Sequence, residues 1–172
     1  MPEVQEGLLF VWGEVMKILI AGNIAAGKST IIREVLKSLP GWSYHAIDDY
    51  RDRYGDHTEA GEDAAKGTFI RDIVLANDCI IESSGVGKLY SLIKPQLTHM
   101  VLVKTSTARC LKRYQERDAD VIVPKEWGKW NVYESIKYIE GCHKRTKYDL
   151  TLSGSSQDLS VNRLQRFIKH NM

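Results

Sequence analysis

The sequence has few of the features that mark specialised protein classes. Its three cysteines, Cys79, Cys110 and Cys142, are far apart, odd in number and form no CxxC pair, which indicates small buried side chains in a reducing compartment. No apolar run reaches the roughly 18 residues that a membrane span needs. The formal net charge is only +2, so no global attraction to nucleic acid or an anionic membrane is expected. We expect a cytoplasmic globular protein.

The chain also lacks internal repeats and low-complexity tracts, and its 172 residues fit one domain. We assign that domain to residues 16–172, because Met16 directly precedes "KILIAG", where a first buried strand would begin. Three interpretations of residues 1–15 remain open. These residues are an added segment, the result of a start position assigned too far upstream, or an arm that packs its apolar residues Leu8, Leu9, Phe10 and Trp12 on the core.

What the chain does have is a regular alternation of apolar runs. Short aliphatic runs predict strands at 17–21, 42–47, 78–81, 99–104 and 148–152. Helical periodicity predicts helices at 29–39, 60–76, 88–94, 107–117, 131–147 and 159–170. Alternating strands and helices are typical of a parallel sheet covered on both faces. The sequence therefore predicts a three-layer α/β fold with a five-stranded parallel sheet.

The loop after the first predicted strand fits the pattern G-x-x-x-x-G-K-[ST] at every fixed position. Because it follows a strand and opens a helix, its backbone N–H groups and the helix N-terminus face one anion. Lys28 can reach the β- and γ-phosphates, and Ser29 can ligate Mg²⁺. The sequence predicts ATP or GTP and Mg²⁺ bound by Gly22, Asn23, Ile24, Ala25, Ala26, Gly27, Lys28, Ser29 and Thr30.

The segment "HAIDDYR" places two acids after the second predicted strand. Phosphoryl transfer to an alcohol needs a carboxylate near the attacking hydroxyl, at the carboxyl end of a strand. Asp48 or Asp49 can fill this role, with the other acid orienting or capping. Arg51 can hold an anionic acceptor or neutralise developing charge. The alternative is an ordinary solvated turn in which an aspartate caps a helix.

"GNIAAGKST" followed by "DDYR" twenty residues after its lysine resembles the polynucleotide 5′-hydroxyl kinase branch of P-loop kinases. That resemblance implies that Asp48 is the general base and that Arg51 clamps the acceptor. From its position beside Asp48 we also expect Asp49 to take part in binding the acceptor. The loop alone is also similar to deoxynucleoside kinases, which carry a Glu after the second strand and an "ERS" signature. This chain has Asp48 and "IIESSG" instead.

The third predicted strand ends in an acid and two hydroxyls, Glu82, Ser83 and Ser84. Glu82 can hold Mg²⁺ through water, or act as the base if Asp48 does not. Ser83 and Ser84 can bind the acceptor. The polynucleotide kinases tend to have an Asp-Thr-Asn-like run here, so this segment departs from them and leaves the acceptor open.

Residues of about 113–130 are expected to form a lid. Arg113 and Arg117 lie four residues apart on one helical face and can stabilise charge on the transferred phosphoryl group while the lid excludes water. The resemblance supports this, since the family's lid has two arginines four apart and then "VP", here Val123-Pro124 one residue further along. A solvated basic helix is the alternative.

Two further segments complete the expected site. Residues 125–147 interleave lysines and arginine with tryptophans and tyrosines, which suits either a nucleic-acid acceptor or an amphipathic helix. Gly154 and Ser155, after the fifth predicted strand, are placed where related kinases cradle adenine.

Together these features predict an ATP- and Mg²⁺-dependent kinase acting on a hydroxyl. The acceptor is the 5′-hydroxyl of DNA or RNA, a base hydroxymethyl such as 5-hydroxymethyluracil in DNA, or a free nucleoside or small alcohol. Small phage P-loop kinases that act on hydroxymethyluracil are similar to this chain. Two other classes remain open, a regulatory ATP-binding switch and a partner-remodelling ATPase.

Overall fold

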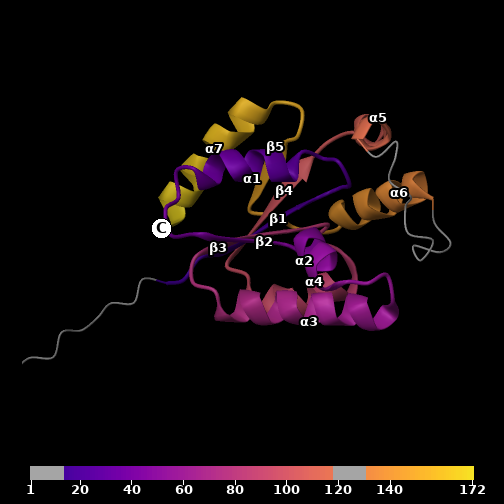
Figure 1. The fold of residues 1–172 in the computed structure, drawn as a ribbon. Helices are drawn as coiled ribbons and strands as arrows, with labels where there is room; N and C mark the ends of the chain where they lie inside the picture. The colour runs from indigo at the N-terminus through magenta and orange to yellow at the C-terminus, as the bar shows by residue number, and fades with distance from the viewer. Residues whose placement is uncertain (1–13, 118–130) are drawn as a thin grey trace, which may run out of the picture.

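A computed structural model describes residues 14–117 and 131–172, in which five parallel strands form one sheet (Figure 1). The strand order is β2-β3-β1-β4-β5, so the first strand lies in the centre. The strands are β1 (Lys17–Gly22), β2 (Ser43–Ala46), β3 (Cys79–Ser83), β4 (His99–Lys104) and β5 (Leu150–Ser153). The predicted five-stranded parallel sheet is confirmed.

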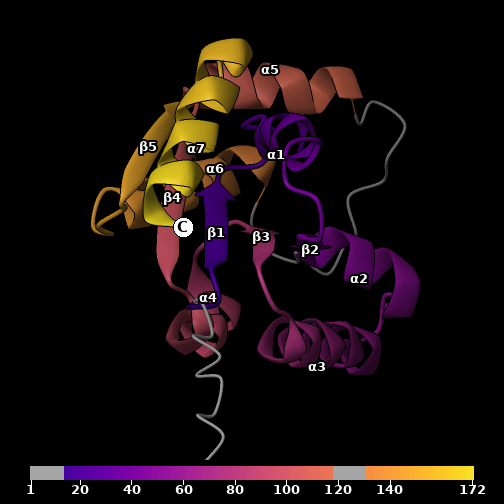
Figure 2. The ribbon, with the colours of Figure 1, turned by 90° about the vertical axis from the view of Figure 1, so that its left-hand side faces the viewer.

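Helices cover both faces of this sheet (Figures 1 and 2). On one side lie α1 and α7, and on the other lie α2, α3 and α4. The helices are α1 (Lys28–Leu36), α2 (Ile47–Tyr54), α3 (Glu59–Leu75), α4 (Gly87–Ile93), α5 (Thr107–Arg117), α6 (Val132–His143) and α7 (Gln157–Asn171), with a 3-10 turn η1 (Lys94–Gln96) after α4.

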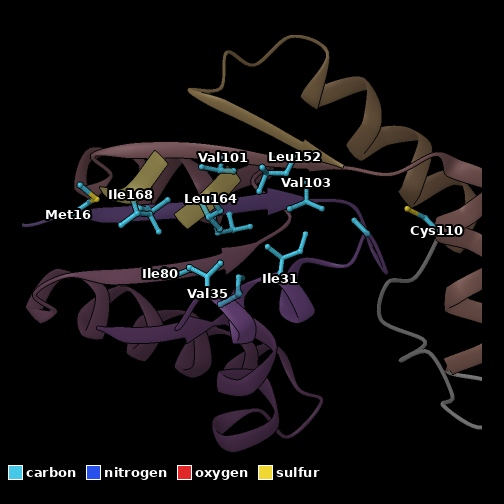
Figure 3. Close-up of a cluster of buried hydrophobic side chains, with 14 of the residues drawn as sticks. Met16, Ile31, Val35, Ile80, Val101, Val103, Cys110, Leu152, Leu164 and Ile168 are labelled. Atoms are coloured by element: carbon cyan, nitrogen blue, oxygen red, sulfur yellow. The ribbon is translucent and has the colours of Figure 1, made fainter. Parts of the chain in front are cut away.

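The alternating side chains of β1 divide the core into two halves. Ile18 and Ile20 face α1 and α7, where they join the cluster shown in Figure 3. Leu19 and Ala21 face the other way and pack with Phe69 and other residues of α2, α3 and α4. A strand that is buried on both faces has a continuous run of apolar residues. For this reason the run "ILIA" could be predicted as a buried strand from the sequence.

The structure corrects the prediction for the segment after β2. The sequence predicted a strand to residue 47 and then a loop, whereas β2 ends at Ala46 and the helix α2 begins at once at Ile47. Asp48 and Asp49 lie in the first turn of α2, where carboxylates interact favourably with the positive end of the helix dipole. The helix predicted at 131–147 is also shorter, ending at His143.

Among the residues that the structure describes, no helix combines the length and the apolar character required to cross a membrane.

Candidate active site

The loop between β1 and α1 is held in a conformation that only some residues adopt easily. Gly27 has φ +99° and Ala25 has φ +55°, both in the left-handed region. A side chain at Gly22 would place its Cβ 2.7 Å from the backbone oxygen of Val103 on the neighbouring strand β4. The loop therefore turns tightly against the sheet before the helix opens.

Asn23 fixes this loop from the inside. Its buried side-chain amide donates to the backbone oxygen of Ile136 on α6 over 2.8 Å, and its Oδ1 accepts from the backbone N–H of Ile24 over 3.0 Å. Asn23 thus ties the phosphate loop to a helix more than a hundred residues further along the chain.

Lys28, at the first position of α1, lies between the loop and two carboxylates. Its Nζ donates to the backbone oxygens of Gly22 and Asn23 over 3.2 and 2.9 Å and lies 3.9 Å from Glu82 Oε1. Burial lowers the pKa of Lys28, and the negative charges of Glu82 and Asp48 oppose that shift. Backbone oxygens at the end of β1 and carboxylates at the ends of β3 and β2 therefore act on one ammonium group.

Glu82 is the second fixed point of the site. It lies on β3, opposite Ile20 of β1 and Ala46 of β2. Ser29 Oγ donates to its Oε1 over 2.9 Å, and the Tyr44 hydroxyl donates to its Oε2. Burial and this bond raise the pKa of Tyr44. Sequence reasoning missed Tyr44, because nothing in the spacing of a tyrosine on a strand indicates a partner 38 residues away.

The pair Ser29–Glu82 suits a magnesium ion. Hydroxyl and carboxylate oxygens are ligands that Mg²⁺ accepts, and it usually completes its coordination with phosphate oxygens and water. Residues 14–117 and 131–172 contain no group of three or more His, Cys, Asp or Glu side chains that could hold a metal. An ion shared between this pair and a bound nucleotide fits the residues better than an all-protein metal cage.

The acceptor-side acids lie on α2. Asp48 and Asp49 are both exposed in its first turn, and Asp48 is close enough to Lys28 for its charge to raise the lysine pKa. Arg51 donates to Asp48 Oδ1 over 3.1 Å and makes a closer pair with Glu62 of α3 over 2.8 Å. Glu62 is a residue that sequence reasoning did not identify.

Tyr50 anchors α2 to its neighbours. Its hydroxyl donates to Asp72 of α3 over 3.0 Å and lies 2.7 Å from Nδ1 of His45 on β2. Its ring packs edge-on against Phe69, with centroids 5.2 Å apart. These contacts fix the orientation of the helix that carries Asp48 and Arg51.

A shallow groove of about 420 Å³ lies near this anchor. It runs along the start of β2 and the end of α3, and none of the predicted site residues lines it; its lining is Gly41, Ser43, His45, Asp72, Leu75, Ala76, Asn77 and Asp78. These residues come from the end of α3, the turn before β3 and the segment that enters β2, whereas Lys28 and Glu82 lie at the carboxyl ends of strands.

The two serines after Glu82 differ from one another. Ser83 is buried, and its Oγ accepts from the backbone N–H of Gly85 over 3.0 Å, so its hydroxyl shapes the turn that follows β3. Ser84 is half-buried at the same carboxyl edge. Gly85, at φ +73°, packs against Ala21 so closely that a Cβ there would reach within 2.5 Å of the alanine Cβ.

The two arginines of α5 occupy different positions. Arg113 donates to three backbone oxygens, those of Ala25 and Ala26 over 3.4 Å each and that of Gly154 over 2.9 Å. It therefore connects the phosphate loop to the loop after β5. Arg117 is at the end of α5, and its positive charge acts to lower the pKa of Lys28.

Gly154 is in close contact with the phosphate loop. Its N–H donates to the backbone oxygen of Lys104 over 2.9 Å. A Cβ at this position would overlap the backbone oxygen of Ala26 and the hydroxyl of Thr105. Thr105 Oγ1 itself donates to the Ala26 oxygen over 2.8 Å. Ser155 is exposed beside it. The predicted adenine-side residues thus adjoin the loop that carries Lys28.

The histidine that ends α6 contributes a further buried group. His143 Nδ1 lies 2.5 Å from the hydroxyl of Tyr148, whereas its Nε2 is buried without a hydrogen-bond partner in the described part of the chain. Burial, with the positive charge of Lys28 adding to it, lowers the pKa of His143 to about 4.

Part of the predicted lid, residues 118–130, lies outside the described residues. So do Lys125, Trp127, Lys129 and Trp130 of the basic, aromatic segment. On α6 the tyrosines Tyr133 and Tyr138 are exposed. Lys137 and Lys144 both pair with Glu140, over 3.7 and 3.4 Å, so this helix offers fewer uncompensated charges than its sequence indicates.

Comparisons with known proteins place the fold. No protein-family model matches the sequence, and no curated protein matches it either. Among solved structures, shikimate kinase from Acinetobacter baumannii in complex with shikimate is similar with a TM-score of 0.64 at 15% identity, over 91% of this chain and 95% of that one. Shikimate kinase from Bacteroides thetaiotaomicron is similar with a TM-score of 0.62 at 14% identity, over 90% and 99%.

A chain of the Pnkp1/Rnl/Hen1 RNA repair complex is also similar, with a TM-score of 0.59 at 17% identity. This likeness covers 79% of this chain and 48% of the other. At such identities the likeness establishes the fold alone. The chain has the three-layer α/β fold of the P-loop kinases.

Proposed function

We propose that this chain is an ATP- and Mg²⁺-dependent kinase that transfers the γ-phosphoryl group to a hydroxyl of a nucleic-acid or nucleoside-type acceptor. The observation that supports it most is the convergence of Lys28, Glu82 and Asp48 at the carboxyl ends of three adjacent strands. Ligands of open α/β sheets bind at this edge. The fold shared with two kinds of P-loop kinase supports a phosphotransferase.

The site has two halves. The donor half comprises the phosphate loop Gly22–Ser29, Glu82, Arg113 and Gly154. Its loop N–H groups and Lys28 would bind the β- and γ-phosphates, and Ser29 and Glu82 would hold Mg²⁺ directly or through water. The bound ion, when present, neutralises charge on the phosphate oxygens. Arg117 adds positive charge from the end of α5.

The acceptor half comprises Asp48, Arg51 and Glu62. The Asp48 carboxylate accepts the proton of the acceptor hydroxyl, whose oxygen forms a bond to the γ-phosphorus while the bond to the bridging oxygen of ADP breaks. Asp49 lies one residue on in the same exposed turn. Arg51 holds Asp48 through their 3.1 Å ion pair and so orients the base.

The deciding experiment uses the full chain, γ-labelled ATP, Mg²⁺ and a panel of acceptors. The panel holds 5′-hydroxyl oligonucleotides of DNA and RNA, DNA containing 5-hydroxymethyluracil, and free nucleosides. Label transferred to any member supports the kinase. Slow ATP turnover with no labelled product would instead identify a nucleotide-binding switch and overturn the proposal.

A further inference from the structure

We infer that the acceptor presents its hydroxyl without a phosphate beside it, as an uncharged nucleoside-type alcohol, and that Glu62 sets this preference by occupying Arg51. The inference rests on the proposed kinase activity and narrows its acceptor. It follows from the contacts of Arg51, from the charge of the helices around it, and from the exposure of Asp48.

Arg51 is paired with the expected base over 3.1 Å, and its donors are largely in use. Its Nε donates to both carboxylate oxygens of Glu62 over 3.1 Å, and its Nη2 donates to Oε1 over 2.8 Å. Its Nη1 donates to Asp48 over 3.1 Å. A guanidinium uses the same planar set of donors to grip a phosphate. A phosphate on the acceptor would therefore have to displace Glu62.

Glu62 is held firmly in that position. Lys66, one turn further along α3, pairs with it over 3.1 Å. Partial burial acts to raise the pKa of Glu62, but the bonds from Arg51 and Lys66 outweigh it and keep that pKa below its usual value. The carboxylate is thus fully charged at neutral pH and satisfied by two cations, which makes it a strong competitor for Arg51.

The segment that carries Asp48 and Arg51 has a net charge of the wrong sign for a phosphate. Residues 47–66, which form α2 and the start of α3, carry seven acidic side chains and three basic ones, a net charge of −4. The whole chain is at +2, so its positive charge lies elsewhere. Asp48 itself is 83% exposed. An anionic strand approaching this base would meet repulsion, whereas an uncharged alcohol would not.

The test compares matched acceptors that differ by one phosphate. A nucleoside, its 3′-monophosphate and a short 5′-hydroxyl oligonucleotide are each phosphorylated with ATP, and kcat/KM is measured for the 5′-hydroxyl. We expect wild type to prefer the nucleoside at least tenfold. Glu62→Gln, which loosens the hold on Arg51, should shift the ratio at least fivefold toward the 3′-monophosphate.

Glu59→Gln is the matched control, because it removes the same charge from the same helix at an exposed position three residues earlier. It should shift the ratio less than twofold. Equal shifts in the two variants would overturn the role of Glu62, since general charge would then explain them. A wild-type preference for the 3′-monophosphate or the oligonucleotide would overturn the inference and leave the kinase standing. Absence of label on every acceptor would instead overturn the kinase itself.

Discussion

The donor and acceptor halves of the site are held in place by different kinds of contact. In the donor half, backbone groups are packed at close range: Arg113 and Thr105 donate to backbone oxygens of the phosphate loop, and Gly154 leaves no space for a side chain beside them. In the acceptor half, exposed or half-buried side chains on α2 and α3 are held by ion pairs.

The two halves also draw on opposite edges of the sheet, with Glu82 of the donor half on β3 between them. The loop after β5 follows one edge strand of the sheet, while α2 and α3 lie beside β2 at the other edge (Figure 2). A backbone-built half tolerates few substitutions, because packed backbone cannot shift independently. In the acceptor half, by contrast, a substitution that removes one charged side chain can alter which acceptor binds. We therefore expect variants of the first half to lose nucleotide, and variants of the second to change the acceptor or the rate.

The largest effect should follow removal of the ammonium that both halves share. Lys28→Met removes the charge that faces the phosphates, and we expect kcat/KM for transfer to fall roughly 10³-fold, as for the loss of a charged group that stabilises a transition state. Steady-state transfer of label from ATP measures this. Lys17→Met would be a poor control, because Lys17 donates to backbone oxygens at the end of α3. Lys37→Met serves better, because Lys37 is exposed and pairs with Glu34 three residues earlier. Activity within tenfold of wild type would contradict the assignment of Lys28.

The next effect separates the halves. Asp48→Asn removes the proposed base but leaves the donor contacts in place, so kcat should fall roughly 10²-fold or more while ATP affinity changes little. Calorimetric titration with a non-hydrolysable ATP analogue and the labelled-product assay measure the two quantities. Asp52→Asn, on the same helix, is the matched control. Normal transfer by Asp48→Asn would assign the base elsewhere, with Glu82 as the first candidate.

Sequence reasoning succeeded where a pattern is local. The phosphate loop could be placed because its glycines, lysine and serine are adjacent in the chain, and the strands could be placed because burial on both faces makes them continuously apolar. It failed at α2. In the sequence, Asp48 and Asp49 resemble residues of a turn, but in the structure they lie in the first turn of α2, where acidic side chains are favourable. The contact between the rings of Tyr50 and Phe69, which holds this helix against α3, is not visible in the sequence.

The contacts that define the site are mostly out of reach of such reasoning. Glu62 meets Arg51 only because α2 and α3 pack against each other, and Tyr44 meets Glu82 only because β2 and β3 are paired in that register. Arg113 was expected at the moving phosphoryl group, and the structure places its guanidinium on backbone oxygens. Which partner a charged side chain takes depends on tertiary packing, which one sequence does not display.

A smaller effect tests the close packing of the donor half. Gly154→Ala would force a Cβ into the oxygen of Ala26 and the hydroxyl of Thr105, and overpacking of this kind costs roughly 1–3 kcal/mol. We expect a lower midpoint of urea unfolding and weaker ATP binding. Gly67→Ala on α3 has no atom within 4 Å of the new Cβ, so it should gain about 0.5–1 kcal/mol from helix propensity. Equal stability changes in both variants would show that the loop is not closely packed.

The smallest effect concerns His143, the partly buried residue that ends α6. Its pKa of about 4 lies below the unfolded value near 6.5. As pH falls, the unfolded chain therefore takes up a proton at this histidine before the folded chain does. The folded state has its full stability above about pH 6.5 and loses part of it as pH falls toward 4. Because the ring is only partly buried, we expect a loss of roughly 1 kcal/mol. His143→Gln should remove this part of the pH dependence in urea unfolding between pH 7 and 4.5, whereas the exposed control His170→Gln should retain it. Parallel pH profiles for wild type and His143→Gln would mean that the imidazole is solvated in the folded protein.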